Sequence, residues 1–143
     1  MAKYASGKYT IKNPEKYMGK RTPTYRSSWE FTFMSFCDNN PAVINWSSEG
    51  IRIPYFNPVS GKNTVYVPDF LVVYIDANQR KHSELIEIKP STETTMESAK
   101  SYRDKLMVAM NMAKWAAADS WAKANGIRFR VVTEYDIFKN QKR

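Results

Sequence analysis

Two short segments each place a carboxylate inside an apolar run that favours β-structure, and together they suggest metal chemistry. The first reads VPDF over residues 67–70 and carries Asp69, and the second reads LIEIK over residues 85–89 and carries Glu87. An ionised carboxylate in such surroundings is costly unless a positive charge offsets it. A divalent metal ion shared by both carboxylates would do so, and Lys89 would add a cation beside them.

The segment between these two runs predicts their relative geometry. Residues 76–80 (DANQR) are polar and turn-forming, which indicates a five-residue hairpin loop centred on Asn78. With this centre Asp69 faces Glu87 directly, with Cβ atoms about 5 Å apart on one face of the sheet, and Lys89 shares that face. Two bare carboxylates repel at this spacing, whereas shared metal coordination suits it.

A second loop, at residues 57–63, extends the predicted cluster. Centring this loop in the same way places Ile51 opposite Asp69, with Glu49 one pleat away on the same face. One bulge or a differently centred loop would move some of these side chains to the other face, because side chains alternate along a strand.

The rest of the sequence predicts elements in the order α-β-β-β-α-β. A helix begins at a capping box at residues 27–30 (SSWE), and a long amphipathic helix covers residues 96–124 before the stop signal Asn125-Gly126. Extended, β-prone stretches cover residues 42–46, 51–56, 64–75, 83–89 and 127–133. We therefore expect an α/β protein with a mixed sheet, in which a three-strand antiparallel meander and a further strand are flanked by two helices.

Composition excludes several classes of protein. The 143 residues fit one domain, and the single Cys37 with the single His82 leaves neither an intrachain disulfide nor a structural zinc site. No apolar run approaches 18 residues and no charged-then-apolar leader is present. We expect a soluble, intracellular protein without membrane contact, in which His82 is incidental rather than a general base.

Positive charge is concentrated at the N-terminus. The net charge is +8, and residues 1–26 hold seven basic side chains and one acid, against 15 and 13 in the remaining 117 residues. Tyrosines alternate with these charges, a mixture that suits contact with phosphates and bases. Residues 1–24 are thus predicted as a basic arm ahead of a single compact domain at residues 25–143, the alternative being a merely solvated terminus. The predicted DNA-binding residues are Lys8, Lys12, Lys16, Lys20, Arg21 and Arg26.

The acidic motif and its setting resemble the PD-(D/E)XK nuclease superfamily. The motif here is Pro68-Asp69, then seventeen residues, then Glu87-Ile88-Lys89, and Glu30 stands where members commonly place another Glu on the first helix. The resemblance implies a restriction-endonuclease-like core and metal-dependent cleavage of DNA. It also implies that Asp69, Glu87, the main-chain carbonyl of Ile88 and Glu30 bind Mg²⁺ or Mn²⁺, while Lys89 orients or deprotonates the attacking water.

Further segments resemble head completion nucleases of T-even-type phages and, more distantly, nuclease subunits that cut transposon ends. They lie at residues 25–30, 46–49, 53–56, 87–90 and 126–130, together with Thr133-Glu134. This resemblance implies an endonuclease that processes packaged DNA ends before tail joining, in the host cytoplasm or the virion, with DNA and head or neck proteins as partners. A homo-oligomer is compatible with it. The alternatives are a non-catalytic virion protein that binds the DNA end or neck, and a junction-resolving, restriction or transposon-end nuclease.

Several candidates also have a purely structural interpretation. For Glu30, a structural role as the acidic member of the capping box has the same weight as a catalytic role, and the residue can have both roles. Glu49 is typical of a surface carboxylate, and Lys114 is typical of the solvent face of the long helix. We retain Glu49 and Lys114 as additional site candidates.

Overall fold

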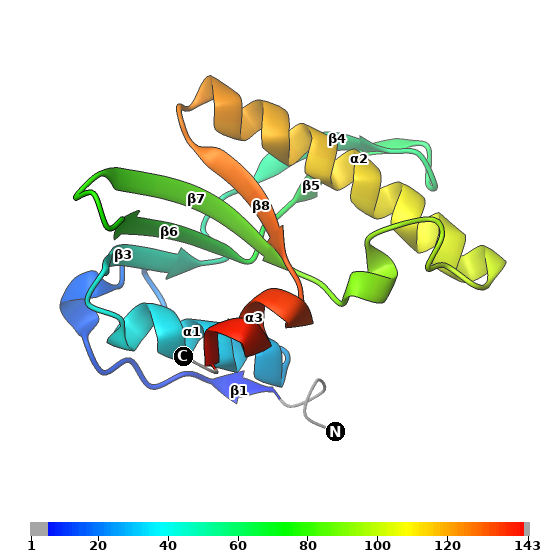
Figure 1. The fold of residues 1–143 in the computed structure, drawn as a ribbon. Helices are drawn as coiled ribbons and strands as arrows, with labels where there is room; N and C mark the ends of the chain where they lie inside the picture. The colour runs from blue at the N-terminus through cyan, green and yellow to red at the C-terminus, as the bar shows by residue number, and fades with distance from the viewer. Residues whose placement is uncertain (1–5, 142–143) are drawn as a thin grey trace.

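The core of the protein is a four-stranded mixed sheet. The computed structural model describes residues 6–141, with side chains through Ile137. The strand order is β3-β6-β7-β8, and the strands are β3 (Val43–Ser48), β6 (Phe70–Ile75), β7 (Lys81–Ile88) and β8 (Arg128–Val132). The first three are antiparallel and β8 runs parallel to β7 (Figure 1). Parallel pairing needs a crossover, which helix α2 (Tyr102–Ala124) supplies.

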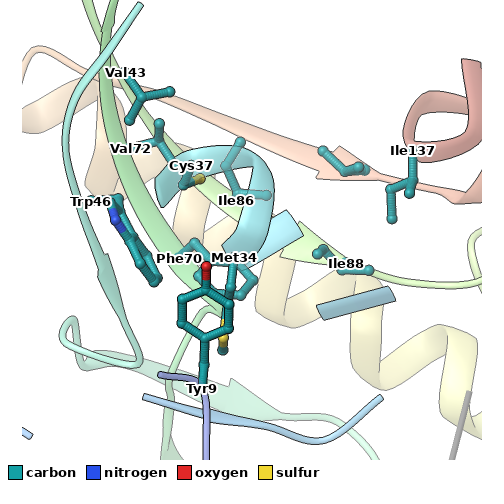
Figure 2. Packing of buried hydrophobic residues seen from close by; sticks show 11 residues of the cluster. Tyr9, Met34, Cys37, Val43, Trp46, Phe70, Val72, Ile86, Ile88 and Ile137 are labelled. Atoms are coloured by element: carbon teal, nitrogen blue, oxygen red, sulfur yellow. The ribbon is translucent and has the colours of Figure 1, made fainter. Parts of the chain in front are cut away.

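Both faces of this sheet are covered. Helices α1 (Ser28–Asn39) and α3 (Glu134–Gln141) lie on one face, and α2 lies on the other with a two-stranded ribbon, β4 (Ile53–Asn57) and β5 (Lys62–Tyr66) (Figure 1). The alternation of side chains sends Phe70, Val72 and Ile86 toward α1 (Figure 2), and Leu71 and Leu85 toward α2. These observations confirm the expected mixed sheet between helices, the restriction-endonuclease-like architecture.

The hairpin that sets the position of the acidic motif has the predicted register. Phe70 pairs with Ile86 and Ile75 with Lys81, so the intervening loop is residues 76–80, centred on Asn78. Asp76 holds this loop, because its Oδ1 accepts the main-chain N–H of Asn78 at 2.8 Å and that of Arg80 at 3.0 Å.

The predicted strand over residues 64–75 is wrong as a single strand. The chain breaks between Tyr66 and Phe70 into β5 and β6, since Pro68 has no N–H with which to continue a ladder. β5 pairs with β4 in the separate ribbon, Ile53 opposite Tyr66, which is one residue away from the predicted register.

The neighbour of β6 is therefore β3, and this corrects the predicted cluster. Ile51 was expected opposite Asp69, but the main-chain N–H of Glu49 donates to the Asp69 carbonyl at 2.9 Å, so Glu49 occupies that place. The remaining pairs of β3 and β6 continue the same register from Ser48–Phe70 until a bulge near Val43.

The long helix is shorter than predicted. It begins at Tyr102 because Ser101 is its N-cap, its Oγ accepting the N–H of Asp104 at 3.0 Å. The stop at Asn125-Gly126 is confirmed, with Gly126 in the left-handed region (φ 70°). The segment before the helix forms a short 3₁₀ turn, η3 (Ser91–Glu93), and helix α3 was not predicted. No helix in the described part of the chain has the length and hydropathy to cross a membrane.

The described part of the predicted basic arm packs on the domain. It forms β1 (Gly7–Lys8), the 3₁₀ turn η2 (Pro14–Lys16) and β2 (Thr24–Tyr25). Tyr9 lies among the core residues (Figure 2), is only 4% exposed, and donates its hydroxyl to an Asp38 carboxylate oxygen at 2.8 Å. Burial, with this contact, raises the pKa of Tyr9 to about 12. The first five residues of the predicted arm lie outside the described residues.

Candidate active site

Asp69 and Glu87 come together where β6 begins and β7 ends. Asp69 directly precedes β6, and its Oδ2 accepts the main-chain N–H of Ile88 at 2.7 Å. In the β6–β7 register Asp69 lies across from Glu87, and both share the face of Leu71 and Leu85, toward α2. The predicted pairing of the two carboxylates on one face is confirmed.

Glu87 is a buried carboxylate whose hydrogen bonding is incomplete. The residue is 6% exposed, and its Oε1 has no hydrogen-bond partner among residues 6–137. Its Oε2 lies 4.0 Å from Nζ of Lys89, which shares its face of the strand. A buried carboxylate oxygen without a partner is costly, and a bound cation is one way to satisfy it.

The two carboxylates hinder each other's ionisation. Burial, then the charges of Glu87 and Glu30, raises the pKa of Asp69 well above its ordinary value, although the Ile88 N–H acts in the opposite direction. Burial likewise raises the pKa of Glu87. A divalent cation between them would relieve both desolvation and repulsion, so this donor set fits a hard metal ion.

Glu30 belongs to both the helix start and the site. Ser27 Oγ accepts the Glu30 N–H at 3.1 Å, which is the first bond of a capping box, whereas the Glu30 carboxylate accepts the N–H of Arg26 at 3.1 Å, one residue before the N-cap Ser27. Its charge acts on Asp69, and burial and the charge of Glu49 raise the pKa of Glu30. No three His, Cys, Asp or Glu side chains of the described residues lie close enough together to hold a metal ion by themselves. The contact of Glu30 with metal stays a prediction.

Glu49 lies at the rim of the site in an ion pair. It follows β3 in the left-handed region (φ 52°), and Arg26 approaches its carboxylate with Nε at 3.3 Å and Nη2 at 3.2 Å. Its side chain is 37% exposed, so this is a surface pair at the edge of the carboxylate cluster.

Lys114 faces the site rather than solvent, which corrects the interpretation from its helical pattern. The side chain comes from α2 and is half-buried, with Nζ 5.7 Å from the centre of the Tyr66 ring. Burial and the charge of Lys89 lower the pKa of Lys114, whereas the charges of Glu87 and Asp69 act to raise it. It is a second cation beside the carboxylate pair.

Tyr66 was not recognised from the sequence. Its buried hydroxyl lies near both the Glu87 carboxylate and the buried indole N–H of Trp115, close enough for these groups to act on the pKa of Tyr66, but no hydrogen bond of good geometry joins them in the described part of the chain. Counting Oε1 of Glu87, three buried polar atoms on this side of the site thus lack a well-formed hydrogen bond within the described residues. The only sequence signal for Tyr66 is its place three residues before Asp69.

A groove lined by basic residues adjoins the carboxylates. Its volume is about 670 Å³, and its walls are residues 17–24 of the arm and the turn at residues 47–50. We call it the basic groove, and four of the predicted DNA-binding residues line it: Lys8, Lys20, Arg21 and Arg26. Glu49 connects the groove to the site, since it pairs with Arg26 and bonds the main chain of Asp69.

The other two predicted DNA-binding residues lie elsewhere. Lys16 donates its ammonium to the carbonyls of Asp38 at 3.0 Å and Asn40 at 2.8 Å, so it caps the C-terminal end of α1. Lys12 donates its main-chain N–H to Asp38 at 2.8 Å. Neither residue lines the basic groove.

Two comparisons relate the chain to known proteins. A family described as TnsA-like endonuclease N terminal matches residues 40–134, a range that includes Asp69, Glu87 and Lys89. The head completion nuclease of Enterobacteria phage T4 is 38% identical over 140 residues, which cover 90% of this chain and 91% of that protein.

Proposed function

The chain belongs to the TnsA-like endonuclease family, and from this premise we propose that it is a metal-dependent DNA endonuclease that processes packaged phage DNA. The observation that carries the proposal is the buried pair of Asp69 and Glu87 with an unpaired carboxylate oxygen and Lys89 beside it. Such a pair destabilises a protein that does not use it, which favours a functional role.

The chain supplies the groups that this chemistry needs. Asp69 and Glu87, with the main-chain carbonyl of Ile88, would hold Mg²⁺ or Mn²⁺, and Glu30 would bind or orient water nearby. The bound ion would polarise the phosphodiester and lower the pKa of a bound water. Lys89 would orient or deprotonate that water, and Lys114 would face the negative charge of the phosphate from α2.

The similarity to the head completion nuclease of phage T4 supports the place that we propose for this reaction in phage assembly. In this proposal the protein would act on the end of packaged DNA before the tail joins, in the host cytoplasm, with head or neck proteins beside it. The rival is a virion protein that binds the DNA end without cutting it. Intact Asp69, Glu87 and Lys89 favour the enzyme, because a binding protein has no use for the unfavourable carboxylate pair.

A direct cleavage assay tests the proposal. Purified protein is incubated with linear, nicked, branched and supercoiled DNA, with Mg²⁺, with Mn²⁺ or with chelator. Metal-dependent cleavage of at least one of these substrates is expected. Cleavage that persists in chelator, or no cleavage of any substrate, contradicts it.

The basic groove yields a prediction about DNA affinity. Replacing both Lys20 and Arg21 by Ala should weaken DNA binding and reduce the slope of log affinity against log salt by about 1.8, since each phosphate contact contributes about 0.9. Binding is measured in chelator by fluorescence anisotropy at several salt concentrations. The matched control replaces two exposed lysines outside the groove, Lys81 and Lys123, and an equal change in that control contradicts the prediction.

Lys114 yields a prediction about catalysis. Lys114→Met should lower kcat/KM for DNA cleavage by about 10- to 100-fold, because one preorganised cation facing the phosphate is lost. Lys114→Arg keeps the charge and should lose less. Lys105→Met, an exposed residue on the same helix, is the control. Wild-type kinetics for Lys114→Met would place Lys114 outside the reaction.

A further inference from the structure

The turn that follows Lys89 is held by a carboxylate from the far end of the chain. Ser91 donates its main-chain N–H to Oε1 of Glu134 at 2.8 Å and its hydroxyl to Oε2 of Glu134 at 3.1 Å. Both donors of one residue therefore meet both oxygens of one half-buried carboxylate. Hydrogen bonds to an ionised acceptor are stronger than neutral ones, so this contact is a firm link between the end of β7 and the start of α3.

This link continues the pairing of the two parallel strands. The last ladder pair is Ile88 with Val132, and the N–H of Lys89 donates to the Val132 carbonyl at 3.0 Å. Pro90 then offers no N–H, so the strand cannot extend the ladder further. Immediately afterwards, the contact between Ser91 and Glu134 joins the segments that follow the two strands. The main chain is therefore bonded both at Lys89 itself and two residues after it.

The side chain of Lys89 has little else to fix it. Among residues 6–137 its ammonium makes no hydrogen bond, and its nearest charged partner is Glu87 at 4.0 Å. Its position therefore depends on the packing around its largely buried side chain and on the main chain that carries it. A main-chain shift of about 1 Å at a catalytic group can cost on the order of 100-fold in rate.

Among the described residues the Glu134 carboxylate makes no hydrogen bond to the start of its own helix. The start of α3 is capped by Asp136, whose Oδ2 accepts the Thr133 N–H at 2.9 Å. The Glu134 carboxylate points instead at Ser91, 43 residues away in sequence. Its hydrogen bonds hold the turn that follows β7.

We propose that Glu134 is a positioning residue that fixes Lys89 for the reaction by holding the Pro90–Ser91 turn, an inference that rests on the proposed nuclease function. Glu134 touches neither DNA nor metal in this role. Its effect passes through the main chain to Lys89 and appears in the rate of the chemical step rather than in DNA binding.

Steady-state kinetics separate this role from a general loss of structure. Glu134→Ala should lower kcat by about 10- to 100-fold while KM and DNA affinity change by less than about twofold. Glu134→Gln should stay within about threefold of wild type, because its amide can accept the Ser91 N–H and donate to the Ser91 hydroxyl. Tyr135→Ala, at an exposed neighbouring position, is the control. Adding Glu134→Ala to Lys89→Ala should cost little further rate, since both act through one group.

Amide hydrogen exchange gives a readout that does not need activity. In Glu134→Ala the amides of Ser91 and Lys89 should exchange at least about tenfold faster, while that of Leu85 in the middle of β7 stays unchanged. Wild-type kcat in Glu134→Ala, beside an active wild-type enzyme, overturns the positioning role and leaves the nuclease function intact. If the wild type itself cuts no DNA, the nuclease function fails, and exchange alone decides whether Glu134 holds Lys89: unchanged exchange at Lys89 overturns the inference.

Discussion

Asp69→Asn is expected to lower the rate of DNA cleavage by about a thousandfold or more. Asn keeps the oxygen that accepts the Ile88 N–H, so the local fold should survive. It removes the charge that would bind the divalent ion, and the loss of metal-assisted stabilisation of the transition state is worth several kcal/mol, or about three powers of ten in rate. The measurements are single-turnover cleavage and calorimetric titration with Mn²⁺, both of which should fail in this variant.

The same substitution should stabilise the metal-free protein. Asp69 is ionised at a cost in the folded state, because burial and the charges of Glu87 and Glu30 raise its pKa. Asn removes that cost, and a gain on the order of 1 kcal/mol in the free energy of unfolding is typical when a strained functional site is neutralised. Urea unfolding in chelator measures it. Glu97→Gln, an exposed carboxylate outside the site, is the control and should change little.

The pH dependence of stability follows from the same pKa. Because the pKa of Asp69 is higher in the folded state than in the unfolded state, the folded state binds the proton more readily. The resulting stabilisation is fully present below the unfolded pKa and is lost as pH rises through the folded pKa. Asp69→Asn should flatten this part of the stability profile. A metal-free variant that is less stable than wild type, with an unchanged pH profile, would show that Asp69 is not under electrostatic strain.

The β6–β7 hairpin was predictable because its information is local. Residues 76–80 contain enough turn-forming side chains to centre the loop on Asn78, and the period of two then fixes which residues share a face. Asp69, Glu87 and Lys89 can thus be grouped from their spacing around this loop. The helix start at Ser27 and Glu30 is equally local, since the two hydrogen bonds of Glu30 span at most four residues.

The parts that the sequence did not predict depend on contacts between distant segments. The choice of β3 rather than β4 as the neighbour of β6 follows from the break at Pro68, and it replaced Ile51 with Glu49 opposite Asp69. Lys114 reaches the site only because α2 crosses the face of the sheet that carries Glu87. A helical pattern predicts that one face of a helix is polar, but it does not show whether that face contacts solvent or a charged site.

The contacts of the N-terminal residues also could not be predicted from the sequence, because their partners are distant along the chain. Composition marks them as basic, and the DNA-binding role of Lys8, Lys20, Arg21 and Arg26 stays a prediction that the basic groove supports. Composition could not tell that Tyr9 enters the core or that Lys16 caps α1. Both depend on Asp38 and Asn40, which lie more than twenty residues later.

Lys89→Ala should separate catalysis from metal binding, which Asp69→Asn cannot do. Cleavage is expected to fall by about 100- to 10,000-fold, the usual loss when a group that transfers or orients a proton is removed. Metal affinity should stay the same or rise, because a positive charge 4.0 Å from Glu87 no longer opposes the cation. Single-turnover rates at saturating metal and a calorimetric titration with Mn²⁺ on the same preparation give both quantities.

The cleavage rates of Lys89→Ala and Lys89→Arg at saturating metal decide between two roles for Lys89. If Lys89 only neutralised Glu87, its removal would leave cleavage intact once metal is saturating, because the metal itself supplies that charge. If Lys89 acts on the attacking water, saturating metal does not restore the rate, and Lys89→Arg recovers little of it, since a guanidinium holds its proton too firmly to exchange it with water near neutral pH. Full cleavage by Lys89→Ala at saturating Mg²⁺ would therefore reduce Lys89 to a structural counter-ion and leave Asp69, Glu87 and Lys114 to account for the reaction.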